Sequence, residues 1–401
     1  MSIHAHGTSS DLSNGTPHPG EATLYLDNAA TTPVRPEALE AMLPYLTGVY
    51  GNPSSHHTLG ERAAQALADA RGRVAAVFGM RQSDVIFTSG GTEANNLAIK
   101  GIAIAAQLGR DRRHLVTTPI EHESILESAD YLERVHGFDV SRVPVDGTGT
   151  VDPAAIGAAL REDTALVSVG YANNEVGTIQ DVGAIATLAR ERRIPVHVDA
   201  VQAAGWLRLA GSGADAISIA GHKIGAPKGT GALVVRGRVP LEPLLHGGGQ
   251  ERGRRSGTEH VAGAVALATA LDLAEAEREE AFARVTRLRE DFVARVLDRV
   301  PSATLTGHPV HRLPGTASFT FAGTSGEAVL LELERRGIVS SSGSACAAGS
   351  DEPSHVLVAM GIEPEVAQTA VRFTLAHAAS KPLDAVADAV AASVAAVQST
   401  R

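Results

Sequence analysis

Short apolar segments alternate with longer alanine-rich segments through most of this 401-residue chain. Residues 85–90, 114–118 and 165–171 are rich in Val, Ile, Leu or Thr and predict strands, and each precedes a stretch typical of a helix. Strands that alternate with helices predict a mostly parallel sheet with helices on both faces. The length suits one large domain plus a smaller one, so we expect an α/β fold.

The pattern changes after a helical stretch that we expect to run from about Glu259 to Val300. Beyond it, short strands, a short helix and a C-terminal alanine-rich helix predict a smaller α+β domain. We therefore expect a large domain at 24–275 and a small one at 276–401, and the first segment of the large domain could pack against the small one. Residues 1–23 are rich in Ser, Gly, Thr, Pro and His, which predicts a disordered extension.

Composition excludes several classes of function. A net charge of −10 disfavours binding to nucleic acid or to anionic membranes, and no apolar run is long enough to span a bilayer. The single cysteine, Cys346, permits no intramolecular disulfide and no multi-cysteine metal site, so we expect no metal. These features, with an N-terminus that lacks the apolar stretch of a signal peptide, predict a cytoplasmic protein.

Polar clusters follow the predicted strands. In open parallel sheets, ligands bind beyond the carboxyl ends of the strands, so residues placed there are candidates for a site. The clusters are SGGTE (89–93), PIEHES (119–124), ANNEVG (172–177), DAVQ (199–202) and GHKIGAPKG (221–229).

Three of these clusters supply complementary chemistry. The glycines before a helix that begins near Thr92 could hold a phosphate, Asp199 ends an apolar strand, and Lys223 directly follows another. Taken singly, the same residues fit a plain turn, a helix cap and a surface charge. Together they are the parts that a pyridoxal-phosphate (PLP) enzyme needs: a Schiff-base lysine, an acid that keeps the pyridine nitrogen protonated, and a phosphate site.

The chain resembles the cysteine desulfurases of PLP fold-type I, in the class V aminotransferase group. The resemblance extends from Leu24 to the C-terminus and implies that fold for the predicted large and small domains. It rests on these motifs, which occur in the family's order and spacing: LYLDNAATTPV, YGNPSSHHTLG, FTSGGTEANNLAIKG, EHESIL, ANNEVGTIQ, VHVDAVQ, GHKIGAPKGTGAL, HGGGQERGRRSGT and SSGSACAAGSDEPSHVLVAMG.

The resemblance implies how the cofactor ring is held. Lys223 would be the Schiff-base lysine and Lys228, in the same motif, would not. Asp199 would pair with the pyridine nitrogen, and Gln202 and Asn174 would contact the ring or its oxygen. His122 would stack on the ring and shuttle protons. Without the resemblance, a structural histidine of the core is the safer interpretation of His122.

The resemblance also implies phosphate and substrate sites. Gly91, Thr92 and His222 would bind the phosphate. Thr258 would reach the phosphate of a second subunit, which implies a homodimer with active sites at the interface. Arg372, with Asn174, would hold the substrate carboxylate, because a guanidinium binds a carboxylate with two parallel hydrogen bonds. Without the resemblance, RRSGT is a basic loop and Arg372 a surface ion pair.

Cys346 indicates the type of reaction. It lies in SSSGSACAAGS, a run of small residues with little to pack, which predicts a mobile loop, although a buried structural cysteine is the alternative. The resemblance implies that Cys346 takes sulfur from L-cysteine as a persulfide, leaving L-alanine. The loop resembles the longer-loop, scaffold-serving branch, which implies an acceptor in iron–sulfur cluster assembly or tRNA thiolation.

The sequence departs from the family's usual motifs at two places, and two other kinds of protein could share this fold. Ala220 replaces a serine that often precedes GHK, and RFTLAH replaces the frequent RFSLG, with Arg372 retained. A selenocysteine lyase, an aminotransferase or a sulfide-releasing C–S lyase could use the same fold, but none of them needs the thiol of Cys346. A non-catalytic scaffold could also keep this fold, but it would not need Lys223, Asp199 and Cys346 together.

Overall fold

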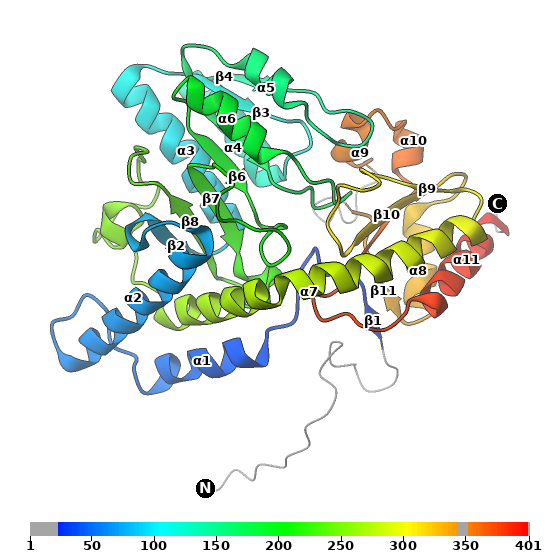
Figure 1. Ribbon diagram of the computed structural model, residues 1–401, viewed down its shortest axis with the longest axis horizontal. Coiled ribbons are helices and arrows are strands. Elements are labelled where there is room, and N and C mark those ends of the chain that lie inside the picture. Colours follow the sequence, from blue (N-terminus) through cyan, green and yellow to red (C-terminus); the bar gives the residue numbers. More distant parts are fainter. Residues whose placement is uncertain (1–22, 344–351, 400–401) are drawn as a thin grey trace, which may run out of the picture.

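A seven-stranded sheet forms the centre of the computed structural model, which describes residues 23–343 and 352–399 (Figure 1). Its strand order is β2-β8-β7-β6-β5-β3-β4. Only β8 runs against its neighbours, so the predicted mostly parallel sheet is confirmed. The strands are β2 (Val85–Thr88), β3 (His114–Thr117), β4 (Asp139–Arg142), β5 (Thr164–Gly170), β6 (Val196–Asp199), β7 (Ala216–Ala220) and β8 (Gly231–Val235).

Helices cover both faces of this sheet because both faces are apolar. Successive strand residues point to opposite sides, so Val85 packs into one hydrophobic cluster and Ile86 into another. The first cluster includes residues of α1 (Pro36–Thr47), α2 (Thr58–Phe78), α5 (Pro153–Ala159) and α6 (Val182–Glu191). The second includes residues of α3 (Gly91–Arg110) and α4 (Glu123–His136).

A smaller antiparallel sheet lies in the C-terminal part of the chain. Its order is β12-β10-β9, from Ala370–Thr374, Thr316–Phe321 and Ala303–Leu305. One face packs on α8 (Gly326–Glu334), α11 (Asp384–Ser399) and the end of α7, with three phenylalanines in edge-on contact at its centre: Phe292, Phe319 and Phe373. The short helices α9 (His355–Ala359) and α10 (Pro364–Ala367) lie between β11 and β12 in the chain.

Two elements connect the sheets. Helix α7 (Val261–Arg299), predicted at Glu259 to Val300, buries its first half in the large-sheet core and Val285, Phe292 and Val296 in the small-sheet core (Figure 1). Strand β1 (Leu24–Tyr25) pairs in parallel with β11 (Ile338–Val339), so the start of the described chain lies with its C-terminal part. The domain boundary at residue 275 falls within α7 and stays a prediction.

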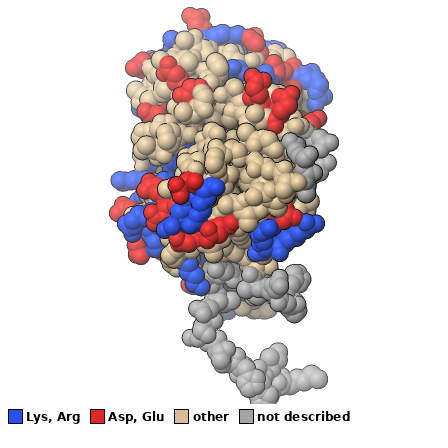
Figure 2. Space-filling view, turned by 90° about the vertical axis from the view of Figure 1, so that its right-hand side faces the viewer, with Lys and Arg blue, Asp and Glu red and all other residues tan. Residues whose placement is uncertain are grey.

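The surface shows no segregation of charge on the face that carries α11. Acidic and basic side chains lie in mixed clusters there, separated by a broad area without charged groups (Figure 2). Within residues 23–343 and 352–399, none of the helices has the length and apolarity needed to cross a bilayer.

A buried histidine links three strands of the large sheet. His197, on β6, hydrogen-bonds through Nδ1 to Ser168 Oγ of β5 and through Nε2 to Ser218 Oγ of β7, each at 2.9 Å. Burial lowers the pKa of His197 to about 3, because the interior disfavours the charged imidazolium. His197 is therefore a neutral hydrogen-bonding bridge at physiological pH.

This bridge makes the fold sensitive to acid. The unfolded chain protonates His197 near pH 6.5 whereas the folded chain does not, so stability falls as the pH drops from 7 towards 3. Between pH 7 and pH 5 we expect His197 to account for about 2 kcal/mol of lost stability. Urea unfolding at both pH values should show a smaller loss in His197→Asn than in wild type. Equal losses would contradict this account.

Candidate active site

A cavity of about 350 Å³ opens at the carboxyl ends of the parallel strands. All but two of the predicted site residues line it: Gly91, Thr92, His122, Asn174, Asp199, Gln202, His222, Lys223 and Arg372. Of the other two, Thr258 is exposed and does not line the cavity, and Cys346 lies outside the described residues.

The amine of Lys223 is held by the N-terminal segment. Lys223 ends a short 3-10 helix (Gly221–Lys223) that begins directly after β7. Its Nζ donates to the backbone oxygens of Ala29 and, at 2.8 Å, Ala30. Gln202 Nε2 donates to the same Ala29 oxygen at 3.1 Å. The LYLDNAATTPV motif therefore forms one wall of the site and orients the lysine.

Asp199 is oriented by two donors at the end of β6. Its Oδ1 accepts from the backbone N–H of Val201 at 2.9 Å, and its Oδ2 accepts from Nδ2 of Asn95 at 2.7 Å. Asn95 also donates to Ser124 Oγ, which lies 2.9 Å from Nδ1 of His122. Sequence reasoning missed Asn95 and Ser124. Asn95 lies one turn after Gly91 on α3, so the helical period could have identified it.

The start of α3 fits an anion. The first N–H groups of a helix have no partner within the helix and favour negative charge. Gly91 permits close packing, since a Cβ there would lie 2.8 Å from Val201. The same Cβ would lie 3.3 Å from the methyl group of Ala220, which brings no hydroxyl to this end of the site.

Glu93 and His222, near this helix start, are each affected by neighbouring charged groups. Arg255 pairs with Glu93 in the first turn at 2.7 Å, which anchors the RRSGT segment beside the cavity. Burial, then the nearby charges of Lys223 and Lys228, lower the pKa of His222 to about 4. His222 is therefore neutral at physiological pH and serves this end of the site as a hydrogen-bonding group.

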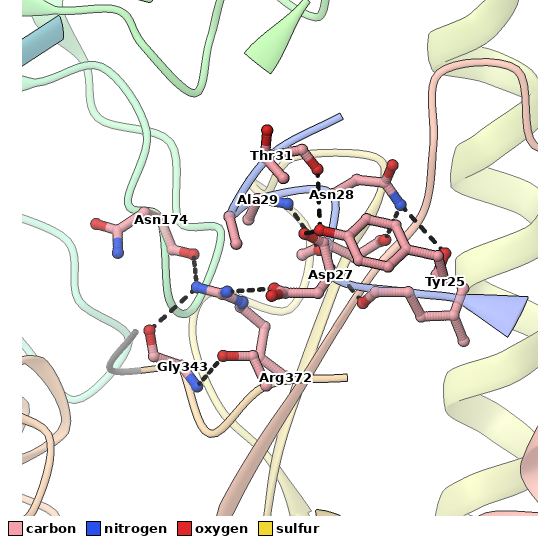
Figure 3. Close-up of polar contacts among 12 residues, drawn as sticks. Tyr25, Asp27, Asn28, Ala29, Thr31, Asn174, Gly343 and Arg372 are labelled. Atoms are coloured by element: carbon pink, nitrogen blue, oxygen red, sulfur yellow. Dashed lines mark hydrogen bonds and ion pairs between the residues drawn. The ribbon is translucent and has the colours of Figure 1, made fainter. Parts of the chain in front are cut away.

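Arg372 forms a buried ion pair (Figure 3). Its side chain is 2% exposed, and Nη2 donates to Asp27 Oδ1 at 2.7 Å. Its Nη1 donates to the backbone oxygens of Asn174 and Gly343 at 2.9 and 3.1 Å. The alternative of a surface ion pair is therefore wrong. Within the described part of the chain the buried Nε has no acceptor, so the guanidinium retains donor capacity.

Two buried carboxyl groups also line the cavity. Burial, reinforced by the charge of Asp199, raises the pKa of Glu121 to about 8, so Glu121 is mainly protonated at neutral pH. Burial also raises the pKa of Glu175, whose Oε2 accepts from Ser354 Oγ at 2.5 Å. Protonated Glu121 therefore adds no second negative charge beside Asp199, and the amine, carboxylate and helix N-terminus of the cavity suit a cofactor that carries a phosphate.

Known proteins share this architecture. The family model of class-V aminotransferases matches residues 24–382. Cysteine desulfurase IscS of Dictyoglomus turgidum is 44% identical over 354 residues, which cover 88% of this chain and 89% of the relative. The IscS-like cysteine desulfurase of Mycobacterium tuberculosis is 46% identical over 360 residues, covering 88% and 91%.

Solved structures agree with the sequence relatives. A structure described as a NifS-like protein superposes with a TM-score of 0.84 at 36% identity, covering 94% of this chain and 99% of that one. A structure of SspA in complex with cysteine gives a TM-score of 0.77 at 35% identity, covering 88% and 98%.

The fold and the family match place the chain in the class-V aminotransferase family, a family of PLP enzymes. Within that class, the chain belongs to the cysteine desulfurase family. The resemblance found in the sequence, and the PLP fold-type I architecture that it implied, are confirmed.

The buried ion pair predicts a large effect on stability. Asp27→Ala leaves the guanidinium of Arg372 buried without its carboxylate, so the free energy of unfolding should fall by about 3 kcal/mol. Asp388→Ala is the matched control, because Asp388 pairs with Arg299 at 2.8 Å but is 67% exposed. Asp388→Ala should lower the free energy of unfolding, measured in urea, by less than about 1 kcal/mol. Similar losses in both variants would contradict the assignment.

Proposed function

We propose that the chain is a PLP-dependent cysteine desulfurase that removes sulfur from L-cysteine and leaves L-alanine. The observation that carries this proposal is the meeting of Lys223, Asp199 and Arg372 around one cavity in a member of this family. A relative solved with cysteine, SspA, supports the choice of substrate.

The lining residues have distinct roles towards the cofactor. Lys223 would hold it covalently, Asp199 would face the ring nitrogen, and His122, Asn174 and Gln202 would contact the ring. The phosphate would lie at the start of α3, where Gly91, Thr92 and His222 would bind it. Thr258 of a second copy of the chain would also reach it. When bound, PLP supplies an electron sink for the charge that develops on the substrate α-carbon.

Arg372 would bind the substrate carboxylate, with Asn174 beside it. Three acceptors already fix the guanidinium plane, so it needs little reorganisation on binding. Its Nε has no acceptor among the described residues, so the guanidinium keeps a donor that is not yet used. The amine of Lys223 would be the group that takes the α-proton.

Sulfur transfer would then involve Cys346. The thiolate of Cys346 attacks the substrate sulfur, the bond from that sulfur to the substrate β-carbon breaks, and L-cysteine plus the thiol become L-alanine plus a persulfide. Two described residues on either side of Cys346 in the chain support this role. Gly343 and His355 line the cavity, and the Gly343 oxygen accepts from Arg372.

The persulfide would pass to a sulfur-acceptor protein, for iron–sulfur cluster assembly or tRNA thiolation. We further propose that the enzyme is a cytoplasmic homodimer. The RRSGT segment supports the dimer, because its Arg255 is anchored beside the cavity whereas Thr258 is exposed and available to a second copy.

Product analysis tests the role of Cys346. With L-cysteine and a thiol reductant, the wild type should form alanine and sulfide in equal amounts. Cys346→Ala should form neither at a measurable rate, because no other cysteine is present to accept the sulfur. Equal turnover by both proteins would instead indicate a C–S lyase that uses the same cavity.

The two lysines of the GHKIGAPKG motif provide a matched pair. Lys223→Ala removes the amine that lines the cavity, so the purified protein should lose the visible absorbance of covalently held PLP and at least about 10³-fold of its turnover. Lys228→Ala removes an exposed charge and should retain both. Absorbance that survives Lys223→Ala would assign the cofactor bond to a different residue.

A further inference from the structure

A chain of hydrogen bonds joins two walls of the cavity. Asn95 is 1% exposed, and its Nδ2 donates one proton to Asp199 Oδ2 at 2.7 Å and the other to Ser124 Oγ at 2.9 Å. Ser124 Oγ lies 2.9 Å from His122 Nδ1. A single amide therefore contacts the acid predicted to face the cofactor nitrogen and, through one hydroxyl, the histidine predicted to stack on the ring.

The donors and acceptors in this chain have a defined direction. The backbone N–H of Ser124 donates to His122 Nδ1 at 3.0 Å, so Nδ1 carries no proton. The Ser124 hydroxyl accepts from Asn95, which leaves its own proton for Nδ1. A neutral imidazole has one N–H, which must then be on Nε2. The reverse orientation of the Asn95 amide would bring its oxygen against the Asp199 carboxylate, where neither group can donate.

The amide of Asn95 is not what the fold alone requires. Its Oδ1 is buried and, among the described residues, has no hydrogen-bond partner. An unpaired buried acceptor lowers stability, so a small apolar residue would suit this helix position better. The contacts of Asn95 that orient Asp199 and His122 account for an asparagine at this position.

We propose that Asn95 is a positioning residue that fixes Asp199 directly and, through Ser124, directs a second donor to Nδ1 of His122. This inference rests on the proposed function for its catalytic consequence. Neutral His122 presents an Nε2–H and enters the reaction as a proton or hydrogen-bond donor. The first proton acceptor is then the amine of Lys223.

Substitutions separate the two branches of the chain. Asn95→Asp keeps the shape but replaces the donor with a second carboxylate beside Asp199, so the dissociation constant for PLP should rise at least tenfold. Ser124→Ala should leave that constant within twofold, because the contact between Asn95 and Asp199 remains, and lower kcat about fivefold. Ser124→Thr retains the hydroxyl and should restore kcat. Thermal unfolding of each variant reports whether it folds.

The deciding measurement needs no turnover. In the full chain with PLP bound and its histidines labelled with ¹⁵N, proton–nitrogen correlation spectra identify the His122 tautomer, and His122→Gln assigns the resonances. We expect the proton on Nε2 in wild type. In Asn95→Asp we expect the same tautomer with a shifted Nδ1 resonance, because the Ser124 hydroxyl loses the donor that directs its own proton to Nδ1. A proton on Nδ1 in wild type, or unchanged PLP affinity in folded Asn95→Asp, would overturn the proposal even if desulfurase activity is confirmed.

Discussion

The direction of the strands in the central sheet is the constraint on which the site depends. Strands β2, β6 and β7 end at the same edge, so Gly91, Asp199 and Lys223 meet although the sequence separates them widely. Strand β8 runs the other way and begins at that edge with Gly231. A Cβ on Gly231 would lie 2.6 Å from Cα of Gly90, so this glycine lets the turn before α3 approach the sheet.

The N-terminal segment supplies contacts to Lys223 and Arg372 that the central sheet does not provide. Backbone oxygens of Ala29 and Ala30 hold the Lys223 amine, while Asp27 holds the guanidinium of Arg372. The same segment continues from β1, which pairs with β11 in the C-terminal part of the chain. The Lys223 amine and the Arg372 guanidinium are therefore positioned by one stretch of the chain, which couples their geometry to the contact between the two sheets.

Periodicity and strand-end chemistry predicted much of the fold and many of the residues around the cavity. Helix α7, the parallel strands and the clusters around Asp199 and Lys223 are local features of the sequence. The partners of these residues are not local: Asn95 meets Asp199 across 104 positions, and Asp27 meets Arg372 across 345. Such contacts depend on how separate elements pack, which no periodicity encodes. For the same reason, the residues alone left Arg372 as a surface ion pair.

Transfer of sulfur to the chain itself is the central claim, and the mass of the intact protein tests it most directly. The chain contains a single cysteine, Cys346. After incubation with L-cysteine and no reductant, the account predicts a mass increase of one sulfur atom per chain, located in the peptide that contains Cys346 and accompanied by one alanine. Alanine that accumulates while the mass of the protein stays unchanged would contradict the account.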